Sequence, residues 1–477
     1  MLESKLIKFQ PGKLIYFPLE QNLITTFLTQ KDLEKIRSTN KESMELIFQQ
    51  KFLFNLKSAK DEGDFDKLKE FISKLNYSAQ YTLSLPTYIT NEQLKSILEQ
   101  KLAKGDSTVG KSVVNLNLSD CRNLTDKSAE YLFPLANILS LDISKCDKLV
   151  KAKFSTKMMH LDISHCRKLK GENLEQMNSL QSMRVNGSAS IIKFKVPGSV
   201  KHLDLSMNNK SIDDIQEMIN KCQNLEYLNI SGRIVGKELN LPETVTSVNF
   251  SKCENFTHSQ IQKTISLCPN LKNLNLSGCE LEKNIELPRS IKSLDLSGCA
   301  QLNQDQIQRM ISQCPSLESL NLSGCELERN LDLPGSVKSL NISYCKKLND
   351  YQVQEMINQC SNLEELNLSS CQIKELTFSK SVNFKKLTIL NCETLKNLTF
   401  SEDTNIGSFN INHCKQLEII NIEKNITVNN SNITSSEELK KMLKGLAASR
   451  SIKILMTKYD PSLSLENPQI VEGAKGR

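Results

Sequence analysis

The sequence contains no tryptophan, and aromatic residues make up only 5% of its 477 positions. It also lacks an apolar run of about eighteen residues, so we expect no membrane-spanning helix. Residues 1–13 show no apolar stretch followed by a small-residue cleavage site, so we expect no standard secretory signal either.

Charge and histidine content limit the possible chemistry. The net charge of +7 is small, and the basic residues are not gathered with aromatics, which argues against nucleic-acid binding. Five scattered histidines give no support for a serine–histidine–aspartate arrangement. His160 and Cys166 are near in sequence but should face opposite ways, so we expect neither a metal site nor a cofactor.

Short internal repeats fill most of the chain. The pattern L-x-L-x-x-C recurs in segments such as SLDISKC, NLNLSGC and SLNISYC, which end at Cys146, Cys279 and Cys345. In the middle of the chain, units of 25 or 26 residues alternate with units of 20, a double repeat of 46 residues. The first Leu-type residues of the fourteen units are Leu116, Leu141, Leu161, Met183, Leu203, Leu228, Val248, Leu274, Leu294, Leu320, Leu340, Leu366, Leu387 and Phe409.

Two periodicities predict the elements of each unit. In a strand, alternate side chains face opposite ways, so the two Leu-type residues should point into a core and the residue between them outward. In the long units, residues 302–314 carry an apolar stripe at helical spacing, formed by Ile307, Met310, Ile311 and Cys314. The short units are punctuated by Pro and Gly and predict an extended or 3₁₀ segment.

The fifteen cysteines follow the same pattern. Eleven stand at the turn after a strand, and Cys222, Cys268, Cys314 and Cys360 end the long-unit helices. Positions that recur in register along a solenoid suit buried reduced thiols better than disulfides, and reduced thiols indicate a cytosolic protein.

These motifs resemble the leucine-rich repeat family, in its cysteine-containing subtype, over roughly residues 110–425. The resemblance implies an α/β fold: a horseshoe-shaped solenoid with parallel concave strands and alternating helical and extended convex segments. Preceding it, residues 82–86 could form a degenerate first strand and residues 89–104 a convex helix.

Residues 105–112, GDSTVGKS, match the Walker A pattern with Gly105, Gly110, Lys111 and Ser112. A phosphate-binding loop needs a strand before it and a helix after it, because the helix N-terminus holds the phosphates. Here the order should be helix, loop, strand, so we expect no nucleotide site.

A second resemblance lies in residues 17–47, which look like an F-box. Pro18, Glu20, Leu28, Asp32 and Leu33 stand at places of the family pattern, as do Ile36, Asn40 and Lys41. The match covers about 35 residues, and Phe17 replaces the usual Leu. The alternative is that these helices only cap the solenoid, which repeat proteins need.

The F-box resemblance implies a substrate-recognition subunit of an SCF-type ubiquitin ligase. The implied adaptor contacts, on a Skp-family adaptor that bridges to a cullin, are Pro18, Leu23, Phe27, Leu28, Leu33 and Ile36. The repeats would hold a protein substrate, and the chain itself would be no enzyme but would act by proximity. No cysteine follows Cys414, which excludes a thioester mechanism in the C-terminal region.

The expected organisation has four parts: an F-box-like segment at 1–60, a linker with cap and degenerate first repeat at 61–109, repeats at 110–435, and a C-terminal cap and tail at 436–477. The expected location is cytoplasmic, in a host cytosol if the chain is a bacterial effector.

The concave surface offers a candidate for partner binding. Most of its outward residues are Ser, Asn or Asp, whose side chains we expect to hydrogen-bond between neighbouring repeats. Binding hot spots usually involve Arg and large aromatic residues. Against the uniform background, neighbouring repeats carry His160, Arg184, His202 and Tyr227, which we predict to bind the substrate. The rival to the ligase hypothesis is a non-enzymatic interaction scaffold or effector that uses this surface.

Overall fold

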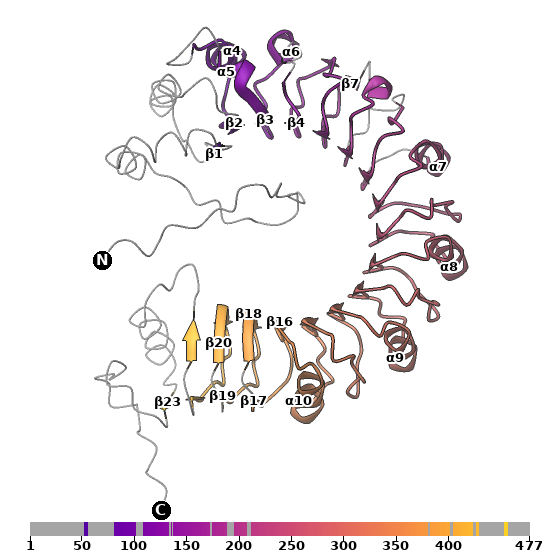
Figure 1. Ribbon diagram of the computed structural model, residues 1–477. Helices are drawn as coiled ribbons and strands as arrows, with labels where there is room; N and C mark the ends of the chain where they lie inside the picture. The colour runs from indigo at the N-terminus through magenta and orange to yellow at the C-terminus, as the bar shows by residue number, and fades with distance from the viewer. Residues whose placement is uncertain are drawn as a thin grey trace, which may run out of the picture.

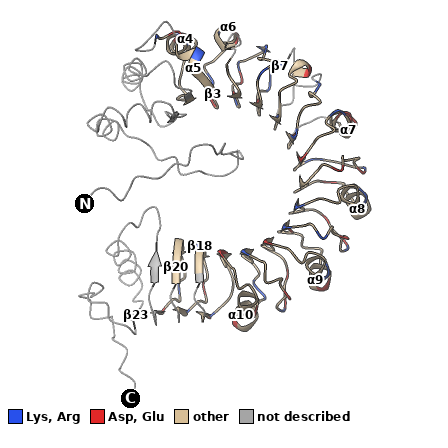
Figure 2. Ribbon diagram, viewed as in Figure 1, with Lys and Arg blue, Asp and Glu red and all other residues tan. Residues whose placement is uncertain are grey.

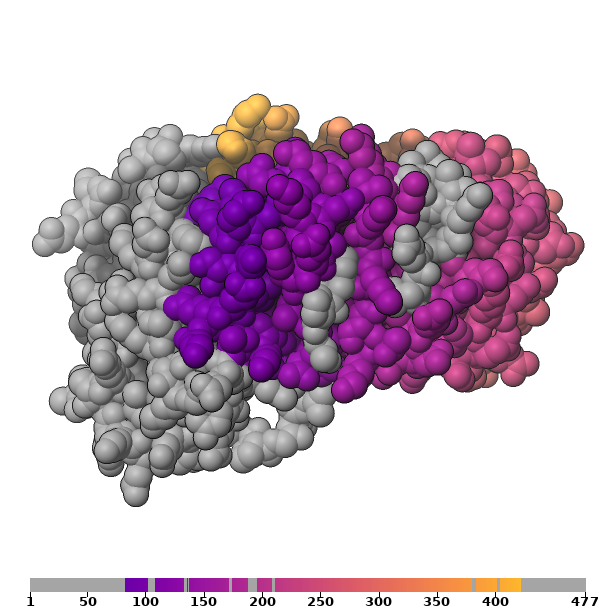
Figure 3. Space-filling model, turned by 90° about the horizontal axis from the view of Figure 1, so that it is seen from above, coloured from indigo at the N-terminus to yellow at the C-terminus, as the bar shows by residue number. Residues whose placement is uncertain are grey.

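The computed structural model describes residues 52–55, 426–428 and 453–456, and residues 81–422 apart from 102–107, 133–134, 136, 172–173, 188–194, 208–210, 380–381 and 401–403. These residues form a horseshoe with a parallel sheet on its inner face and helices on its outer face (Figure 1). Seen from above, the units from indigo to pink pack side by side as a continuous wall (Figure 3).

The inner sheet has 17 strands, each parallel to its neighbours. The fourteen predicted Leu-type residues all lie in register along it, as in the pairs Leu116 with Leu141 and Leu387 with Phe409. We call each inner strand a rung. The rungs are β1 Phe52–Asn55, β2 Tyr81–Ser84, β3 Val113–Asn117, β4 Ser140–Asp142, β6 His160–Asp162, β8 Ser182–Arg184, β9 His202–Asp204, β10 Tyr227–Asn229, β11 Ser247–Asn249, β12 Asn273–Asn275, β13 Ser293–Asp295, β14 Ser319–Asn321, β15 Ser339–Asn341, β16 Glu365–Asn367, β18 Val382–Leu390, β20 Thr404–Asn412 and β22 Ile426–Val428.

A continuous core runs behind this sheet, because both Leu-type residues of each of the fourteen predicted rungs point into it. Leu294 and Leu296 are 1% and 0% exposed. All fifteen cysteines are buried and free, as predicted. Burial of apolar surface in register along the whole array stabilises the solenoid, since each rung covers its neighbours.

The cysteines at the turns also bond the rungs together. The Cys299 thiol donates to the carbonyl of Leu276 at 3.2 Å, and the Cys325 thiol donates to that of Leu296 at 3.2 Å. Each thiol thus reaches the second Leu-type residue of the preceding rung, whose carbonyl is buried. Burial raises the pKa of both thiols to about 12, so they stay protonated and keep donating.

The long units form helices as expected, and their N-termini are built alike. Five of them begin with a capping box, in which the N-cap residue and the third helical residue bond each other's backbone. The N-caps are Thr90, Ser211, Thr257, Asn303 and Asn349. The helices are α4 Asn91–Leu98, α6 Asp126–Leu132, α7 Ile212–Lys221, α8 His258–Ser266, α9 Gln304–Ser312 and α10 Asp350–Gln359.

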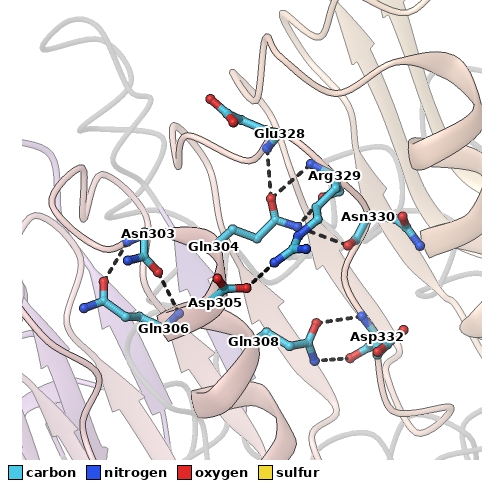
Figure 4. A network of polar contacts seen from close by, with 9 residues as sticks. All are labelled: Asn303, Gln304, Asp305, Gln306, Gln308, Glu328, Arg329, Asn330 and Asp332. Carbon is cyan, nitrogen blue, oxygen red and sulfur yellow. Dashed lines mark hydrogen bonds and ion pairs between the residues drawn. The ribbon is translucent and has the colours of Figure 1, made fainter.

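Glutamines of the helices satisfy the backbone of the irregular short units. The Gln308 amide accepts from the N–H of Asp332 at 2.8 Å and donates to its carbonyl at 3.0 Å (Figure 4). Gln216 makes the same pair of bonds to Asn240, two double repeats earlier. The convex segments of the short units therefore need no helix or strand, because neighbouring side chains replace the missing backbone partners. The one 3₁₀ segment among the described residues is η1 Leu174–Gln176.

The convex side changes near the C-terminus, where strands replace helices. A four-stranded parallel sheet forms from β17 Glu375–Phe378, β19 Asn397–Phe400, β21 Ile419–Ile422 and β23 Lys453–Met456. Phe378 of β17 stacks on Phe400 of β19 with ring centroids 5.2 Å apart. Edge-on contacts join these rings to Phe384 of β18 and Phe409 of β20. A smaller pair on the convex side is β5 Lys151–Ala152 with β7 Lys170–Gly171.

No helix among the described residues is both long and apolar enough to cross a membrane.

Candidate functional site

Three columns of side chains run across the rungs on the concave face. The first column is the residue before the first Leu-type position, the second column is the residue after it, and the third column lies three residues after it. In eleven rungs, the second-column Asn or Asp accepts a hydrogen bond from the backbone N–H of the third-column residue, at 2.8–3.1 Å. These bonds end the strand with an Asx-type turn.

The bonding differs in one respect from the sequence expectation. The Asn and Asp side chains bond mainly within their own rung rather than between rungs. The chain turns directly after each short strand, and this turn brings the backbone N–H two residues later within reach of the side chain. A bond between rungs does occur from the Asn321 amide to Asp295 at 3.1 Å. The second column is therefore structural, and only departures from its usual Asn can mark a site.

The structure brings three of the four predicted residues into the first column. His160 aligns with Ser182, which aligns with His202, and His202 aligns with Tyr227. The rings of His202 and Tyr227 are 6.4 Å apart and tilted by 47°. Burial lowers the pKa of both histidines, and for His160 the nearby His202 lowers it further, so both are neutral near pH 7.

The fourth predicted residue, Arg184, interrupts the second column. Its Nε lies 3.6 Å from a carboxylate oxygen of Asp162 and 3.8 Å from one of Asp204, on the two adjacent rungs. Burial and the neighbouring Asp142 raise the pKa of Asp162, while its bonds from Ser164 and the Arg184 charge oppose this. We call His160, His202, Tyr227, Arg184, Asp142, Asp162 and Asp204 the concave patch.

Sequence reasoning missed the three aspartates of the concave patch. They were grouped with the structural Asn residues, whose turn bonds they share. The available signal was composition: in the second column, Asp occurs at four rungs, and three of these lie on β4, β6 and β9.

A shallow hollow of about 390 Å³ lies at the edge of the concave patch. Its lining comes from residues next to the first column and from the turns that lead into β6, β8 and β9. Lys201 in this lining pairs with Glu226 at 2.8 Å. The lining residues are Lys157, Met159, Asn178, Ser179, Gln181, Ser199 and Lys201.

The Walker A match has the wrong surroundings for phosphate binding. Its last four residues form the single-turn helix α5 Val109–Ser112, which leads directly into strand β3. Gly110 is buried, and an added Cβ would lie 2.8 Å from Leu135 and 3.0 Å from the Leu98 carbonyl. The helix that precedes the match and the strand that follows it have the predicted order, opposite to that of a phosphate-binding loop.

Catalytic or metal chemistry finds no support in the described part of the chain. There, no group of three or more His, Cys, Asp or Glu side chains could hold a metal ion. Cys166 is 0% exposed and burial raises its pKa to about 12, so it is unsuited to act as a nucleophile. The predicted adaptor contacts, from Pro18 to Ile36, lie outside the described residues.

Comparisons with known proteins agree with the repeats. The family model described as Leucine Rich repeat matches residues 313–328 and 359–374, and it matches no part of residues 17–47. Each matched segment runs from the end of a long-unit helix through a rung and its cysteine. No curated protein matches the chain in sequence.

Solved structures similar to the chain include two of YopM and one of InlJ. YopM, a leucine-rich effector protein from Yersinia pestis, is 18% identical with a TM-score of 0.37, covering 56% of this chain and 78% of its own. YopM from Yersinia enterocolitica is 13% identical with a TM-score of 0.34, covering 83% and 82%. The functional domain of InlJ from Listeria monocytogenes, which includes a cysteine ladder, is 14% identical with a TM-score of 0.35, covering 77% and 80%. The register of the rungs and the matched repeats together identify the fold of this chain as a leucine-rich-repeat solenoid.

Proposed function

We propose that the chain is a non-enzymatic interaction protein that binds a protein partner through the concave patch. The observation that carries this proposal is the clustering of the unusual residues. On the other rungs from β11 to β15 the first column holds only Ser or Asn, whereas β6, β9 and β10 hold two histidines and a tyrosine. Half-buried aromatic side chains on a polar face are typical anchors for a partner.

The register supports this proposal because it makes the patch continuous. Neighbouring rungs lie about 4.8 Å apart, so five rungs from β4 to β10 span on the order of 20 Å. A partner segment laid across them could contact both columns at once. Aromatic and charged groups in adjacent columns supply contact area and orientation together.

A narrower form of the proposal is that the partner is a ubiquitination substrate. It rests on the residue match of 17–47 to the F-box pattern. In that case Pro18, Leu33 and their neighbours would hold a Skp-family adaptor and through it a cullin, and the concave patch would hold the substrate.

One pull-down with two variants tests both forms. The concave variant is His160→Ser/His202→Ser/Tyr227→Ser, in which each change introduces the residue that other rungs carry in the first column. The N-terminal variant is Pro18→Ala/Leu33→Asp. Each is used as bait beside the wild type, with a purified Skp-family adaptor added, and captured proteins are quantified by mass spectrometry.

The two forms predict different losses. The concave variant should lose at least one partner of the wild type by about tenfold, while its adaptor capture stays unchanged. The N-terminal variant should lose only the adaptor. If the concave variant captures every partner as the wild type does, the patch is not the binding surface. If wild-type protein captures no adaptor, the ligase form is wrong and the interaction protein remains.

A further inference from the structure

The charge of the concave patch is opposite in sign to that of the whole chain. Charged residues of both signs are spread along the described ribbon (Figure 2), and the full sequence carries a net charge of +7. Within the first and second columns from β4 to β10, the charged residues are Asp142, Asp162 and Asp204 against Arg184 alone. The histidines there are neutral near pH 7, so the two columns carry an excess of two negative charges.

Each of these carboxylates has one oxygen committed to the fold. The first oxygen accepts from the backbone of Ser144, Ser164 or Ser206 at 2.9 Å. The second oxygens of Asp162 and Asp204 lie 3.6 and 3.8 Å from Arg184, which is longer than a hydrogen bond. The aspartates therefore retain capacity to accept a charge-assisted hydrogen bond from a donor outside the chain.

A different residue type marks the same rungs independently. His160, His202 and Tyr227 form the adjacent column, and the rings of His202 and Tyr227 lie near each other. The face of a tyrosine ring also attracts a cation. Carboxylates on β4 and β6 and a tyrosine ring on β10 suit a segment that carries cationic side chains better than an apolar or anionic one.

We infer that the concave patch binds a partner segment through a lysine or arginine side chain placed between the carboxylates of Asp142 and Asp162, on the adjacent rungs β4 and β6. The ring of Tyr227, three rungs beyond Asp162, contacts another part of the same segment. The inference rests on the proposed function, since it names the chemistry of the partner for that surface. Arg184 is then not an anchor for the partner. It lies between Asp162 and Asp204 and offsets part of their charge, so it weakens the attraction of the patch for a cation.

The repeat itself supplies substitutions that should leave the fold intact. Asn249 and Asn275 stand in the second column and make the same turn bond as the aspartates, at 2.9 and 2.8 Å. Asp142→Asn/Asp162→Asn therefore removes charge and keeps the turns. Asp295→Asn is the control, because Asp295 accepts from the N–H of Ser297 at 2.9 Å, as Asp142 and Asp162 do from Ser144 and Ser164, but lies outside the patch on β13.

The test is fluorescence anisotropy with two labelled nonapeptides, one alternating glycine with arginine and one alternating glycine with glutamate. The net charge of the chain alone would favour the glutamate peptide, so the inference makes the opposite prediction. Wild-type protein should bind the arginine peptide at least tenfold more tightly. Asp142→Asn/Asp162→Asn should reduce that affinity by about tenfold, and Asp295→Asn should not change it.

Two further variants separate the inference from the proposed function. Arg184→Asn should tighten arginine-peptide binding by about threefold, because it leaves two carboxylates unopposed. A loss of binding in Arg184→Asn, or equal binding by wild type and Asp142→Asn/Asp162→Asn, overturns the inference. If arginine-peptide binding falls in His160→Ser/His202→Ser/Tyr227→Ser but not in the aspartate variant, the surface binds partners without charge recognition. The proposed function then stands and the inference fails.

Discussion

Arg233 shows how a single residue can take over the role of another in a repeat. It stands at the turn position that cysteine occupies in eleven rungs, and it is only 5% exposed. Its guanidinium donates to the carbonyl of Leu205 at 3.2 Å, the bond that a thiol makes elsewhere. The position thus requires a buried hydrogen-bond donor for the carbonyl of the preceding rung. Burial disfavours the charged form of the guanidinium and so lowers the pKa of Arg233.

Removal of this donor should destabilise the chain more than its replacement by a thiol. Arg233→Ala leaves the Leu205 carbonyl without this bond, at a cost of about 2 kcal/mol. Arg233→Cys restores the donor and avoids burial of a guanidinium, so it should retain most of the stability. Urea unfolding followed by circular dichroism measures the difference. Equal midpoints for the two variants would show that the hydrogen bond to Leu205 is not what the position needs.

At the scale of elements, the pairing of a helix with an irregular strand-like segment depends on glutamine. Gln308 in α9 bonds both backbone groups of Asp332, in a unit with no regular structure at that point. Gln304 bonds the backbone of Glu328, Arg329 and Asn330 in the same way (Figure 4). The long amide side chain supplies one donor and one acceptor, as a neighbouring strand would.

Gln308→Ala should therefore cost about 1–2 kcal/mol, although the residue is on the convex surface. Gln308→Glu keeps the acceptor for the Asp332 N–H but loses the donor, so an intermediate cost is expected. Gln223, whose amide donates only to Asn220 at the end of α7, provides a comparison. If Gln308→Ala and Gln223→Ala have the same small effect on unfolding, the amide pair contributes nothing beyond ordinary surface contacts.

At the scale of the whole molecule, the buried thiols couple stability to pH. Burial raises the pKa of Cys166, Cys299 and Cys325 to about 12, from an ordinary value of 9.0. Thiolates therefore form more readily in the unfolded chain. The stabilising effect of keeping the thiols protonated is complete below about pH 9 and is lost as the pH rises towards 12.

We expect an alkaline loss of stability that begins near pH 9 and is steep, because many thiols contribute about 1 kcal/mol each at pH 10. Thermal unfolding between pH 7 and 10.5, with a reductant present, measures it. A Cys299→Ala/Cys325→Ala variant should be less stable at pH 7 but show a shallower decline. A melting temperature that stays constant to pH 10.5 in the wild type would contradict the expectation.

Much of the fold follows from short-range pattern. The alternation of Leu-type residues placed all fourteen predicted rungs in register, and the spacing of the cysteines predicted buried thiols. The stripe of Ile307, Met310 and Ile311 predicted α9, in which all three are buried. The concave patch was predicted in part, since the sequence distinguished His160, Arg184, His202 and Tyr227 by residue type. The aspartates were not distinguished, because they share the turn bond of the structural Asn residues.

The backbone conformation of the turn after each strand does not follow from the sequence pattern. In each of the fourteen predicted rungs, the residue before the cysteine position has a left-handed backbone, with positive φ. Only five of these residues are glycine, and Met207 and Tyr344 adopt the same conformation at φ 49° and 62°. No local preference predicts this for a bulky side chain. The stacking of each turn on the neighbouring turns requires this left-handed conformation, because the turns bond to one another in the register of the sheet.

The sequence by itself determined the repeat, the burial of its thiols and the order of helix and strand around residues 105–112, because these depend on periodicity within one or two units. The tertiary structure alone decided which side chains meet across rungs: Arg184 between two aspartates, Arg233 on the Leu205 carbonyl, and Gln308 on Asp332. These contacts join residues 20 or more positions apart. Their geometry depends on how the units stack, and no single unit contains that information.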